Sequence, residues 1–382
     1  MKILHCVVDD KFLDGAISLF GTDKRVDNDW CFFTEDSQYT FSYIKNPIVR
    51  IMPLSSFCSV VVNYDVVILH SLPSLPVDNI LSIPQPIKVV WFLFGHEMYD
   101  GTYPLVPFDL YLDYTKQIKE ELYGKFTIWK RCKRAIKKLI YKGPYYHVLK
   151  RIDYFSGVFE YEYGLLKERY PHFHAKQLDF YYGSTDFFIK DKLSTDITNQ
   201  MRNVIIGNSG NMINNHVDAI EYLCQNANLD LIDKVIMPLS YGGGIPYVSK
   251  VKYYALDLLG NKACILDNYL PANEYWELVS NCKIAIYALA RQSASDNVLY
   301  QLMNGAKVYM TNRSAAFHYL KGLGIYLYTL EDDMQSINEE LTEEQILKNR
   351  EIIVKKFSAR TLIQRVHSII DILIWDNKDA KR

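Results

Sequence analysis

The chain of 382 residues contains no pair of cysteines at the spacing of a zinc site or of a redox motif. Its seven cysteines are odd in number and scattered, so they predict no disulfide framework either, and we expect reduced thiols in the cytoplasm. No apolar run approaches the roughly 18 residues that a membrane-spanning helix needs. Because the first residues, Met1 to His5, already have the pattern of a strand, we expect no signal peptide.

What the chain does contain is enough apolar sequence for two folded domains. Hydrophobic residues make up 49% of the chain and charged residues 23%, a balance that is typical of globular proteins. A length of 382 residues exceeds what one ordinary hydrophobic core supports, so we expect two domains.

The net charge of −1 conceals one strongly basic segment, residues 116–151. It carries twelve Lys and Arg residues against Glu120 and Glu121, a net charge of +10, with apolar residues at helical spacing from Trp129 to Ile140. A basic amphipathic helix of this kind is typical of a protein that lies on an anionic membrane surface. Two alternatives stay open: a solvated helix whose apolar stripe faces the core, and a nucleic-acid surface. No nucleic-acid motif accompanies the segment, so we expect no nucleic acid as partner.

Strands and helices alternate along both halves of the chain, which predicts parallel sheets covered by helices. In the first half, β-branched apolar runs predict strands such as Val66–His70 and Lys88–Phe94. A polar stretch without periodicity, residues 183–198, separates the halves. We therefore expect one domain in residues 1–185, which includes the basic segment, and a second in residues 186–382, whose last helix can pack back on the first domain.

In the second half, two polar loops each connect an apolar strand to a helix. Residues 207–210 follow the strand 203–206, and residues 290–297 follow the strand 284–289. Glycines let a backbone approach a ligand, and the amides and dipole of a helix N-terminus favour phosphate. Ligands of doubly wound sheets bind at the carboxyl ends of the strands. Two such loops on one sheet predict a diphosphate pocket, although either loop alone can be an ordinary turn.

Two such domains, with phosphate loops in the second, have the architecture of the GT-B glycosyltransferases. The expected fold class is therefore α/β, with two Rossmann-like, doubly wound parallel-sheet domains that face each other across a cleft. This step rests on analogy between folds until particular residues support it.

Particular residues do carry a resemblance. The chain resembles glycosyltransferase family 56, the TDP-N-acetylfucosamine:lipid II N-acetylfucosaminyltransferases, also labelled 4-alpha-L-fucosyltransferases. The matching runs are Val204 to Asn211 with Asn215-His216, Val235-Ile-Met-Pro238 with Tyr241, Ala290-Arg291-Gln292, His70, Trp91, Gly95, Tyr99 and Asp179-Phe-Tyr-Tyr. The chain departs from the family at residues 293–297, where the family contains glycine, and at His96-Glu97, where the family has a small residue followed by Asp.

The resemblance implies an enzyme that takes a deoxy- or amino-sugar from a TDP- or UDP-linked donor. The acceptor would be a polyprenyl-diphosphate-linked glycan in bacterial surface polysaccharide synthesis, and the enzyme would lie on the inner face of the cell membrane. Two alternatives stay open: a GT-B-shaped enzyme of other chemistry, such as a sugar-nucleotide epimerase or a polysaccharide pyruvyl transferase, and a non-catalytic scaffold that docks on the membrane.

Glycosyl transfer requires stabilisation of the departing diphosphate. We find no convincing Asp-x-Asp metal site: Asp109 and Asp113 lie four residues apart, and Glu331-Asp332-Asp333 is typical of a solvated turn. We therefore expect no metal and no cofactor, and we assign this role to helix N-termini and to Arg291, whose guanidinium forms forked hydrogen bonds with phosphate.

Eleven residues of the second half are our candidates for binding the nucleotide sugar. Asp296 or Asn297 would hold the ribose hydroxyls, or would simply cap the next helix. Tyr269 would contact the base and Tyr241 the diphosphate or sugar, although each tyrosine can equally be ordinary packing. The full set is Gly207, Asn208, Ser209, Gly210, Tyr241, Tyr269, Arg291, Gln292, Ser293, Asp296 and Asn297.

A general base for the acceptor hydroxyl is expected from the first domain. Glu97 is the first candidate because it follows the strand 88–94, and its alternative is a solvated loop carboxylate. Asp10, after the first strand, is the second, and its alternative is an N-cap of the next helix. His96 is the third because its pKa range includes neutrality, although a single histidine is more often structural.

Overall fold

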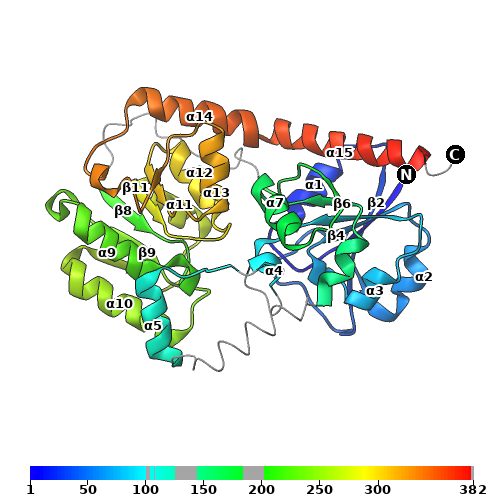
Figure 1. Cartoon of the computed structure of the whole chain (residues 1–382), viewed down its shortest axis with the longest axis horizontal. Coiled ribbons are helices and arrows are strands. Elements are labelled where there is room, and N and C mark those ends of the chain that lie inside the picture. The colour runs from blue at the N-terminus through cyan, green and yellow to red at the C-terminus, as the bar shows by residue number, and fades with distance from the viewer. Residues whose placement is uncertain (100–103, 107, 125–143, 184–201, 380–382) are drawn as a thin grey trace. The chain divides into compact units, whose positions relative to one another are not determined.

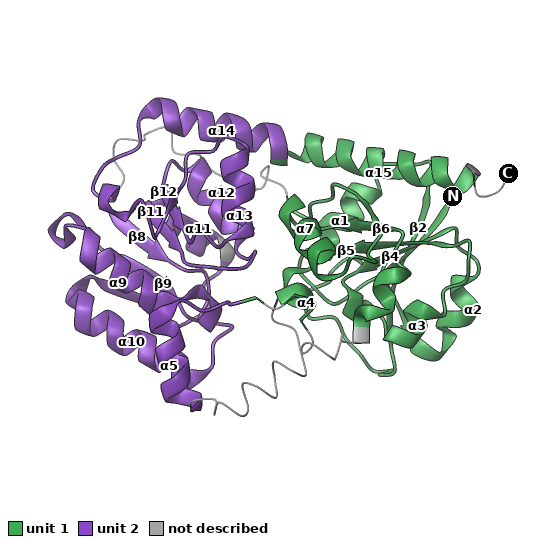
Figure 2. Cartoon of the chain, viewed as in Figure 1, with its two compact units in different colours: residues 1–108, 138–184, 357–382 green, residues 109–137, 185–356 purple. Residues whose placement is uncertain are grey.

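The computed structural model describes residues 1–99, 104–106, 108–124, 144–183 and 202–379. The chain forms two compact units (Figure 2). Unit 1 comprises residues 1–108, 138–184 and 357–382, and unit 2 comprises residues 109–137 and 185–356. Neither unit is continuous in sequence, so this division differs from a single boundary at residue 185.

Unit 1 is built on a parallel sheet whose seven described strands have the order β3-β2-β1-β4-β5-β6-β7. The strands are β1 (Lys2–Cys6), β2 (Asp27–Thr34), β3 (Arg50–Pro53), β4 (Val66–His70), β5 (Lys88–Phe92), β6 (Tyr154–Ser156) and β7 (Lys176–Gln177). All of β4 and most of β1 and β5 are buried, as a parallel sheet covered on both faces requires. The strand order reverses between the neighbours β1 and β4.

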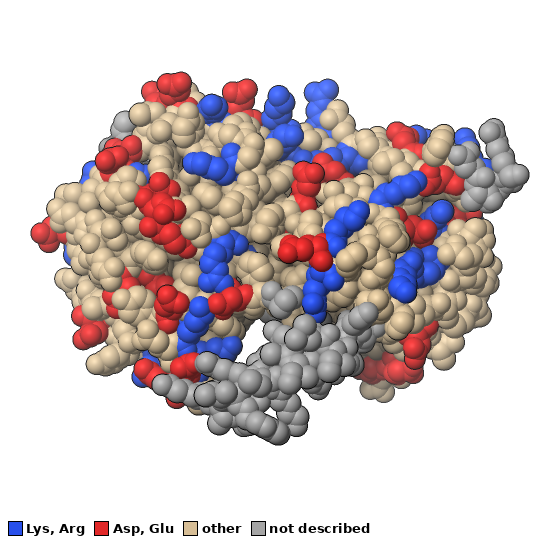
Figure 3. Space-filling view, in the orientation of Figure 1, with Lys and Arg blue, Asp and Glu red and all other residues tan. Residues whose placement is uncertain are grey.

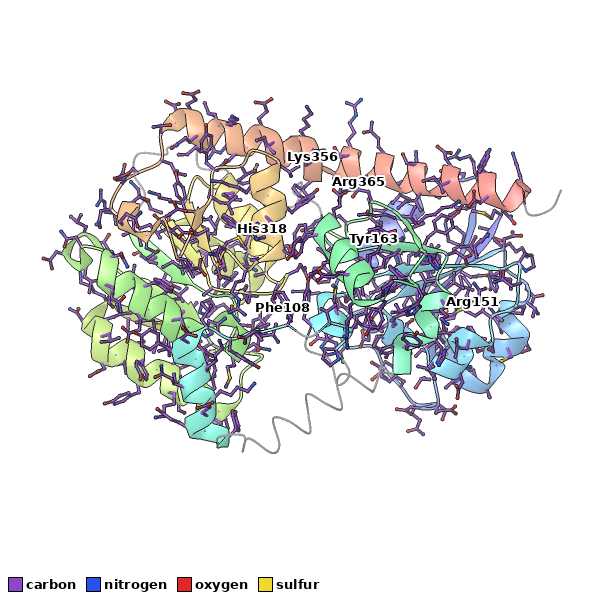
Figure 4. The ribbon with its side chains drawn as sticks, in the orientation of Figure 1. Phe108, Arg151, Tyr163, His318, Lys356 and Arg365 are labelled. Atoms are coloured by element: carbon purple, nitrogen blue, oxygen red, sulfur yellow. The ribbon has the colours of Figure 1, made fainter. Side chains whose placement is uncertain are left out.

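The helices of unit 1 cover this sheet and include the C-terminal helix (Figure 1). They are α1 (Leu13–Phe20), α2 (Phe57–Val61), α3 (Val77–Leu81), α4 (Gly95–Tyr99), α7 (Glu160–Arg169) and α15 (Ala359–Asp379). α15 packs against α1, and Arg25 bridges to its Asp371 at 2.5 Å. Arg365 of α15, labelled in Figure 4, pairs with Asp179 at 3.2 Å. The last helix of the chain therefore belongs to the unit that contains the first strand.

Unit 2 is built on a second parallel sheet, whose six described strands have the order β10-β9-β8-β11-β12-β13. The strands are β8 (Asn203–Ile206), β9 (Val235–Pro238), β10 (Ala263–Leu266), β11 (Cys282–Tyr287), β12 (Lys307–Met310) and β13 (Tyr328–Thr329). The chain adds β9 and β10 on one side of β8 and then returns to place β11 on the other side. The strand order of this sheet therefore reverses between β8 and β11.

The helices of unit 2 include one from the first half of the chain, α5 (Asp113–Tyr123). The others are α9 (His216–Asn226), α10 (Ile245–Leu259), α11 (Ala272–Ser280), α12 (Ser295–Met303), α13 (Ala315–Gly322) and α14 (Glu343–Phe357). α5 packs against α9 and α10 (Figure 1), and its Ile118 lies in the core of the unit. Asp218 of α9 also accepts the N–H and hydroxyl of Thr115. These contacts place residues 109–123 in unit 2.

Candidate functional site

The two predicted phosphate loops follow β8 and β11, the strands between which the order of sheet 2 reverses. In open α/β sheets, ligands bind outside the carboxyl ends of strands at such a reversal. The segments that contain the loops are also joined, because the side chain of Asn215, between the first loop and α9, donates a hydrogen bond at 2.6 Å to the carbonyl oxygen of Ala288, just before the second loop. The topology therefore brings residues 207–210 and 290–297 to one place.

The two glycines of the first loop have different structural roles. Gly207 has φ +69°, and a Cβ there would lie 2.9 Å from His216 Nε2. Gly210 packs against the loop after β9: its N–H donates to Tyr241 O at 2.7 Å, and a Cβ would lie 3.0 Å from Leu239 O. We expected both glycines to let the backbone approach a ligand, but Gly210 is needed so that two loops of the protein can pack.

Two asparagines that were not among the predicted binding residues hold the first loop in shape. Asn214 is buried, accepts the Asn208 N–H at 3.1 Å and donates to Ser209 O at 3.1 Å. Asn215 has φ +49°, and its amide joins the loop to Leu110 O and Leu112 N as well as to Ala288. The sequence signal for both was an Asn-Asn pair just before a helix, since Asn tolerates the left-handed region and bonds to nearby backbone.

His216, the first residue of α9, is fully buried beside the same loop. Burial lowers its pKa to about 3, so the ring is neutral. Tyr247 Oη accepts the His216 backbone N–H at 3.3 Å and lies 3.1 Å from Nδ1. The other ring nitrogen, Nε2, faces Gly207, where a Cβ would lie 2.9 Å from it. The buried imidazole therefore leaves no room for a side chain at position 207.

The second loop leads into α12, which begins at Ser295, so residues 295–297 of the predicted loop already belong to the helix. Its N-cap residue is Ala294, with φ +55°, so neither Asp296 nor Asn297 caps the helix. Asn297 accepts a hydrogen bond from Tyr275 Oη at 2.8 Å, and Asp296 lies in the first turn. Arg291 is half-buried and donates to Gln292 O at 2.7 Å. Gln292 and Ser293 are half-buried on the same loop.

The two predicted tyrosines differ in how far they belong to this site. Tyr241 is half exposed, and its backbone carbonyl accepts the Gly210 N–H, so it is fixed beside the first loop. Tyr269, in the loop after β10, is 77% exposed. The two side chains are close enough for Tyr269 to raise the pKa of Tyr241, in addition to the larger effect of burial.

In unit 1, Glu97 is a buried carboxylate, not the solvated loop residue that we considered as an alternative. Oε1 accepts from Trp91 Nε1 at 2.8 Å and Phe94 N at 3.0 Å, and Oε2 accepts from Ser71 Oγ and Leu72 N, both at 2.6 Å. Burial raises its pKa to about 7, although these donors act in the opposite direction. Glu97 therefore joins the loops that follow β4 and β5.

The other two predicted base candidates lie at the same edge of the sheet. Asp10 is half-buried, and its Oδ1 accepts the Phe12 N–H at 3.0 Å. α1 begins at Leu13, so Asp10 does not occupy the N-cap position that we considered as an alternative. Burial raises the pKa of Asp10. His96 lies on α4 with an exposed side chain.

No group of three or more His, Cys, Asp or Glu side chains that could hold a metal ion occurs within the described parts of the chain. The chain does contain one Asp-x-Asp, Asp27-Asn28-Asp29, and it lies in β2. Asp29 accepts hydrogen bonds from Tyr64 Oη at 2.7 Å and Arg50 Nη2 at 3.0 Å. The side chain of Asn28 is hydrogen-bonded to His5, with Oδ1 3.0 Å from His5 Nε2. These partners give the motif a structural role.

The centre of the basic segment, residues 125–143, lies outside the described residues, and with it most of the predicted membrane-facing helix. In the described ends, Lys116 pairs with Asp109 at 2.8 Å and Arg151 with Asp153 at 2.9 Å. On the face drawn in Figure 3, cationic and anionic side chains are interspersed. No helix in the described residues is long and apolar enough to span a membrane.

Solved structures with the same fold are glycosyltransferases and related enzymes. A glycosyltransferase from Rickettsia africae is 15% identical, with a TM-score of 0.63 over 98% of both chains. HepE from Anabaena, in complex with UDP and glucose, is 12% identical, with a TM-score of 0.59 over 97% of this chain and 99% of HepE. Sucrose-phosphate synthase from Thermosynechococcus elongatus is 9% identical, with a TM-score of 0.63 over 98% of this chain and 100% of the synthase. At these identities the likeness establishes the GT-B fold.

Sequence comparison identifies the family. A search of curated proteins finds no match. Residues 157–354, slightly more than half of the chain, match the family model of the 4-alpha-L-fucosyltransferases, glycosyl transferase group 56. The chain therefore belongs to glycosyl transferase group 56, and it is a glycosyltransferase with the GT-B fold.

Proposed function

We propose that this glycosyltransferase moves a deoxy- or amino-sugar, similar to N-acetylfucosamine, from a TDP- or UDP-linked donor to a polyprenyl-diphosphate-linked glycan in bacterial surface polysaccharide synthesis. Membership of the 4-alpha-L-fucosyltransferase family supports the class of sugar. HepE, which shares the fold, has been crystallised with UDP and with UDP-glucose, and this supports a nucleotide-diphosphate sugar as the donor.

The observation that carries the proposal is a pair of helix N-termini at the strand reversal of unit 2. α9 follows β8 and α12 follows β11, and among the described residues neither N-cap residue makes a side-chain cap hydrogen bond, although the first N–H of α9, that of His216, donates to Tyr247 Oη. The free N–H groups and the dipole of a helix N-terminus favour an anion. Because a diphosphate carries charge on two linked groups, it fits two such N-termini. Arg291, on the loop that leads into α12, adds a guanidinium that matches phosphate geometry.

These groups provide what the chemical step requires. The diphosphate gains negative charge as its bond to the sugar breaks, and donors that are already in place lower the barrier. We assign this role to the first-turn amides of α12 and to Arg291, and the dipole of α9 adds to the positive potential. Asp296 and Tyr241 remain our candidates for the ribose and the sugar. We propose that no metal is needed, and transfer that is lost in EDTA and restored by Mg²⁺ or Mn²⁺ would contradict this.

For the general base, the geometry favours Asp10 over Glu97. A carboxylate accepts about four hydrogen bonds, and Glu97 already accepts four from the protein. Oδ2 of Asp10 accepts none from the described residues, and the raised pKa of Asp10 brings it closer to neutrality, which suits a base. His96, exposed on α4, is the third candidate.

The base assignment can be tested with two isosteric variants. Asp10→Asn should lower kcat by about 10²–10⁴-fold while nucleotide affinity is kept, because general-base catalysis typically contributes that much. Glu97→Gln should mainly destabilise unit 1, because the glutamine NH₂ group would replace a carboxylate oxygen and face donors instead of accepting from them. Transfer by Asp10→Asn at the wild-type rate would exclude Asp10 as the base.

We also propose that the enzyme is peripheral on the inner face of the cell membrane and is held there by the basic segment, residues 116–151. The support is its net charge of +10 in a chain whose total is −1.

Calorimetry with TDP, UDP and GDP tests the donor site first, because a nucleotide that binds the folded protein is detected directly and also raises its melting temperature. Mass spectrometry of the products formed from a nucleotide sugar and a lipid-linked glycan then tests the reaction. A glycosylated lipid supports the proposal. An isomerised nucleotide sugar or a pyruvylated glycan would indicate another chemistry, and nucleotide binding without turnover would indicate a scaffold.

A further inference from the structure

A line of buried polar side chains crosses the strand reversal of unit 1. His5 in β1 and His70 in β4 are both fully buried, and His5 Nδ1 lies 3.0 Å from His70 Nε2. At one end, His5 Nε2 lies 3.0 Å from Asn28 Oδ1. At the other end, His70 Nδ1 lies 2.7 Å from Tyr182 Oη. The line therefore runs from Asn28 to Tyr182 through two histidines.

The chemistry of the end groups fixes the direction of each hydrogen bond. Asn28 presents its oxygen to His5, since its Nδ2 faces Phe20 O, so His5 Nε2 must donate. Burial lowers the pKa of His5 to about 3, so the ring holds one proton and Nδ1 is an acceptor. His70 therefore donates through Nε2, and burial keeps this ring neutral too, so its Nδ1 is an acceptor. The proton of the last bond must come from the hydroxyl of Tyr182.

Tyr182 is thus held as a donor toward the protein, and its oxygen keeps lone pairs that can accept a hydrogen bond from elsewhere. The residue is half-buried at the carboxyl edge of the sheet, after β7. Its ring centroid lies 5.0 Å from that of Phe94 and 6.4 Å from that of Phe12, two half-buried aromatics that follow β5 and β1. Asp10 is close enough to act on the Tyr182 phenol electrostatically. Three aromatic rings and two oxygen acceptors therefore gather at this edge.

We propose that Tyr182, Phe94 and Phe12 form a platform for a pyranose ring of the acceptor glycan, with Tyr182 Oη and Asp10 accepting hydrogen bonds from its hydroxyls. Aromatic rings contact the apolar C–H face of a sugar, and a few placed polar groups fix its orientation. A phosphate or an ionised carboxylate offers no proton to these two acceptors, so the polarity favours a ligand that donates hydrogen bonds, such as a sugar hydroxyl. His70, His5 and Asn28 are positioning residues, and the inference rests on the proposed glycosyl transfer.

The binding test uses the full chain with methyl β-D-glucopyranoside and its N-acetylglucosamine counterpart as probes, titrated by saturation-transfer NMR. Tyr182→Phe should weaken binding of the pyranoside about threefold to tenfold, the usual worth of a neutral hydrogen bond. The matched control is Tyr163→Phe, because the Tyr163 hydroxyl (Figure 4) donates to Ala175 O at 2.8 Å in the same unit, outside the platform. This control should bind the pyranoside as the wild type does.

Deoxyfluoro analogues of the pyranoside locate the hydroxyl that is recognised, because fluorine cannot donate. Replacement of one sugar hydroxyl should weaken binding to the wild type and have no further effect on Tyr182→Phe. The positioning role of His70 is tested separately by NMR, through the ¹⁵N signals of its two ring nitrogens. They should show the proton on Nε2, and the Nδ1 signal should shift on sugar addition in the wild type and not in Tyr182→Phe. A protonated Nδ1 on His70 would reverse the polarity and overturn the inference.

Affinity for UDP, measured on the same samples, separates the two proposals. The platform is overturned if neither pyranoside binds the wild type up to about 50 mM, beyond the millimolar range of weak ligands, or if Tyr182→Phe binds like the wild type. Pyranosides that bind as expected while no nucleotide binds would leave the platform in place and contradict the proposed function instead.

Discussion

Asn215 joins the segments that follow β8 and β11, which contain the two loops of the candidate site, so its replacement is the sharpest test of that site. The side chain accepts the Leu112 N–H at 2.9 Å and donates to Leu110 O at 3.1 Å and Ala288 O at 2.6 Å. Its backbone has φ +49°, in the left-handed region. Asn215→Ala removes the hydrogen bonds and strains the backbone, whereas Asn215→Gly removes only the hydrogen bonds.

The expected cost follows from these two contributions. Nδ2 of Asn215 also donates to Ile213 O at 3.0 Å, so four backbone groups are affected. Each buried polar group left without a partner costs about 1–3 kcal/mol, and with partial relaxation we expect about 2–4 kcal/mol from loss of the side chain. Alanine in the left-handed region adds about 1–2 kcal/mol, which glycine avoids. Unit 2 should therefore be most stable with Asn at position 215, less stable with Gly, and least stable with Ala.

Hydrogen exchange of the β8 and β11 amides measures this, because it reports on unit 2 separately from unit 1. Calorimetry with UDP should show weaker binding for both variants, since the loops are no longer joined. If Asn215→Ala and Asn215→Gly are equally stable, the strain argument is wrong. If both retain wild-type stability and UDP affinity, the hydrogen bonds of Asn215 do not hold the site together.

Three further predictions follow from the site and from the charges. Arg291→Ala should weaken UDP binding by about 1.5–3 kcal/mol, the worth of a hydrogen bond to a charged group, and an unchanged calorimetric affinity would remove Arg291 from the site. Acid should destabilise the protein: burial lowers the pKa of His5 and His216 to about 3, so stability is lost as the pH falls below about 6.5, where unfolded histidines take up protons. Burial also lowers the pKa of His70, so three histidines act in this direction, whereas Glu97, whose pKa is raised to about 7, and Asp10 act in the opposite direction. Equal urea midpoints at about pH 7.5 and about pH 5 would contradict a net loss of stability in acid. Charge reversal to Glu at four cations of the basic segment should release the protein from anionic vesicles, as high salt should in part, and equal flotation of wild type and variant would favour a solvated helix. The four cations are Lys130, Arg131, Lys133 and Arg134.

The sequence by itself determined the features that depend on short stretches of chain. Apolar β-branched runs such as Val66–His70 and Val204–Ile206 predicted parallel strands, because a strand covered on both faces must be apolar along its length. Polar loops after strands, with residues of positive φ such as Gly207, predicted where a ligand would bind. These features suffice for the GT-B fold, since strand, turn and helix signals act over a few residues.

Only the tertiary structure decided which distant residues meet. The sequence offered Glu97 as a general base or, alternatively, as a solvated loop carboxylate, but Ser71 and Trp91 donate hydrogen bonds to it, and a local pattern does not reveal its burial. Residues 109–123 belong to unit 2 because Thr115 bonds to Asp218, 103 positions later. The hydrogen bond between His70 and Tyr182 spans 112 positions. The reason is physical: a buried polar group must find a partner, and the fold, not the neighbouring sequence, supplies it.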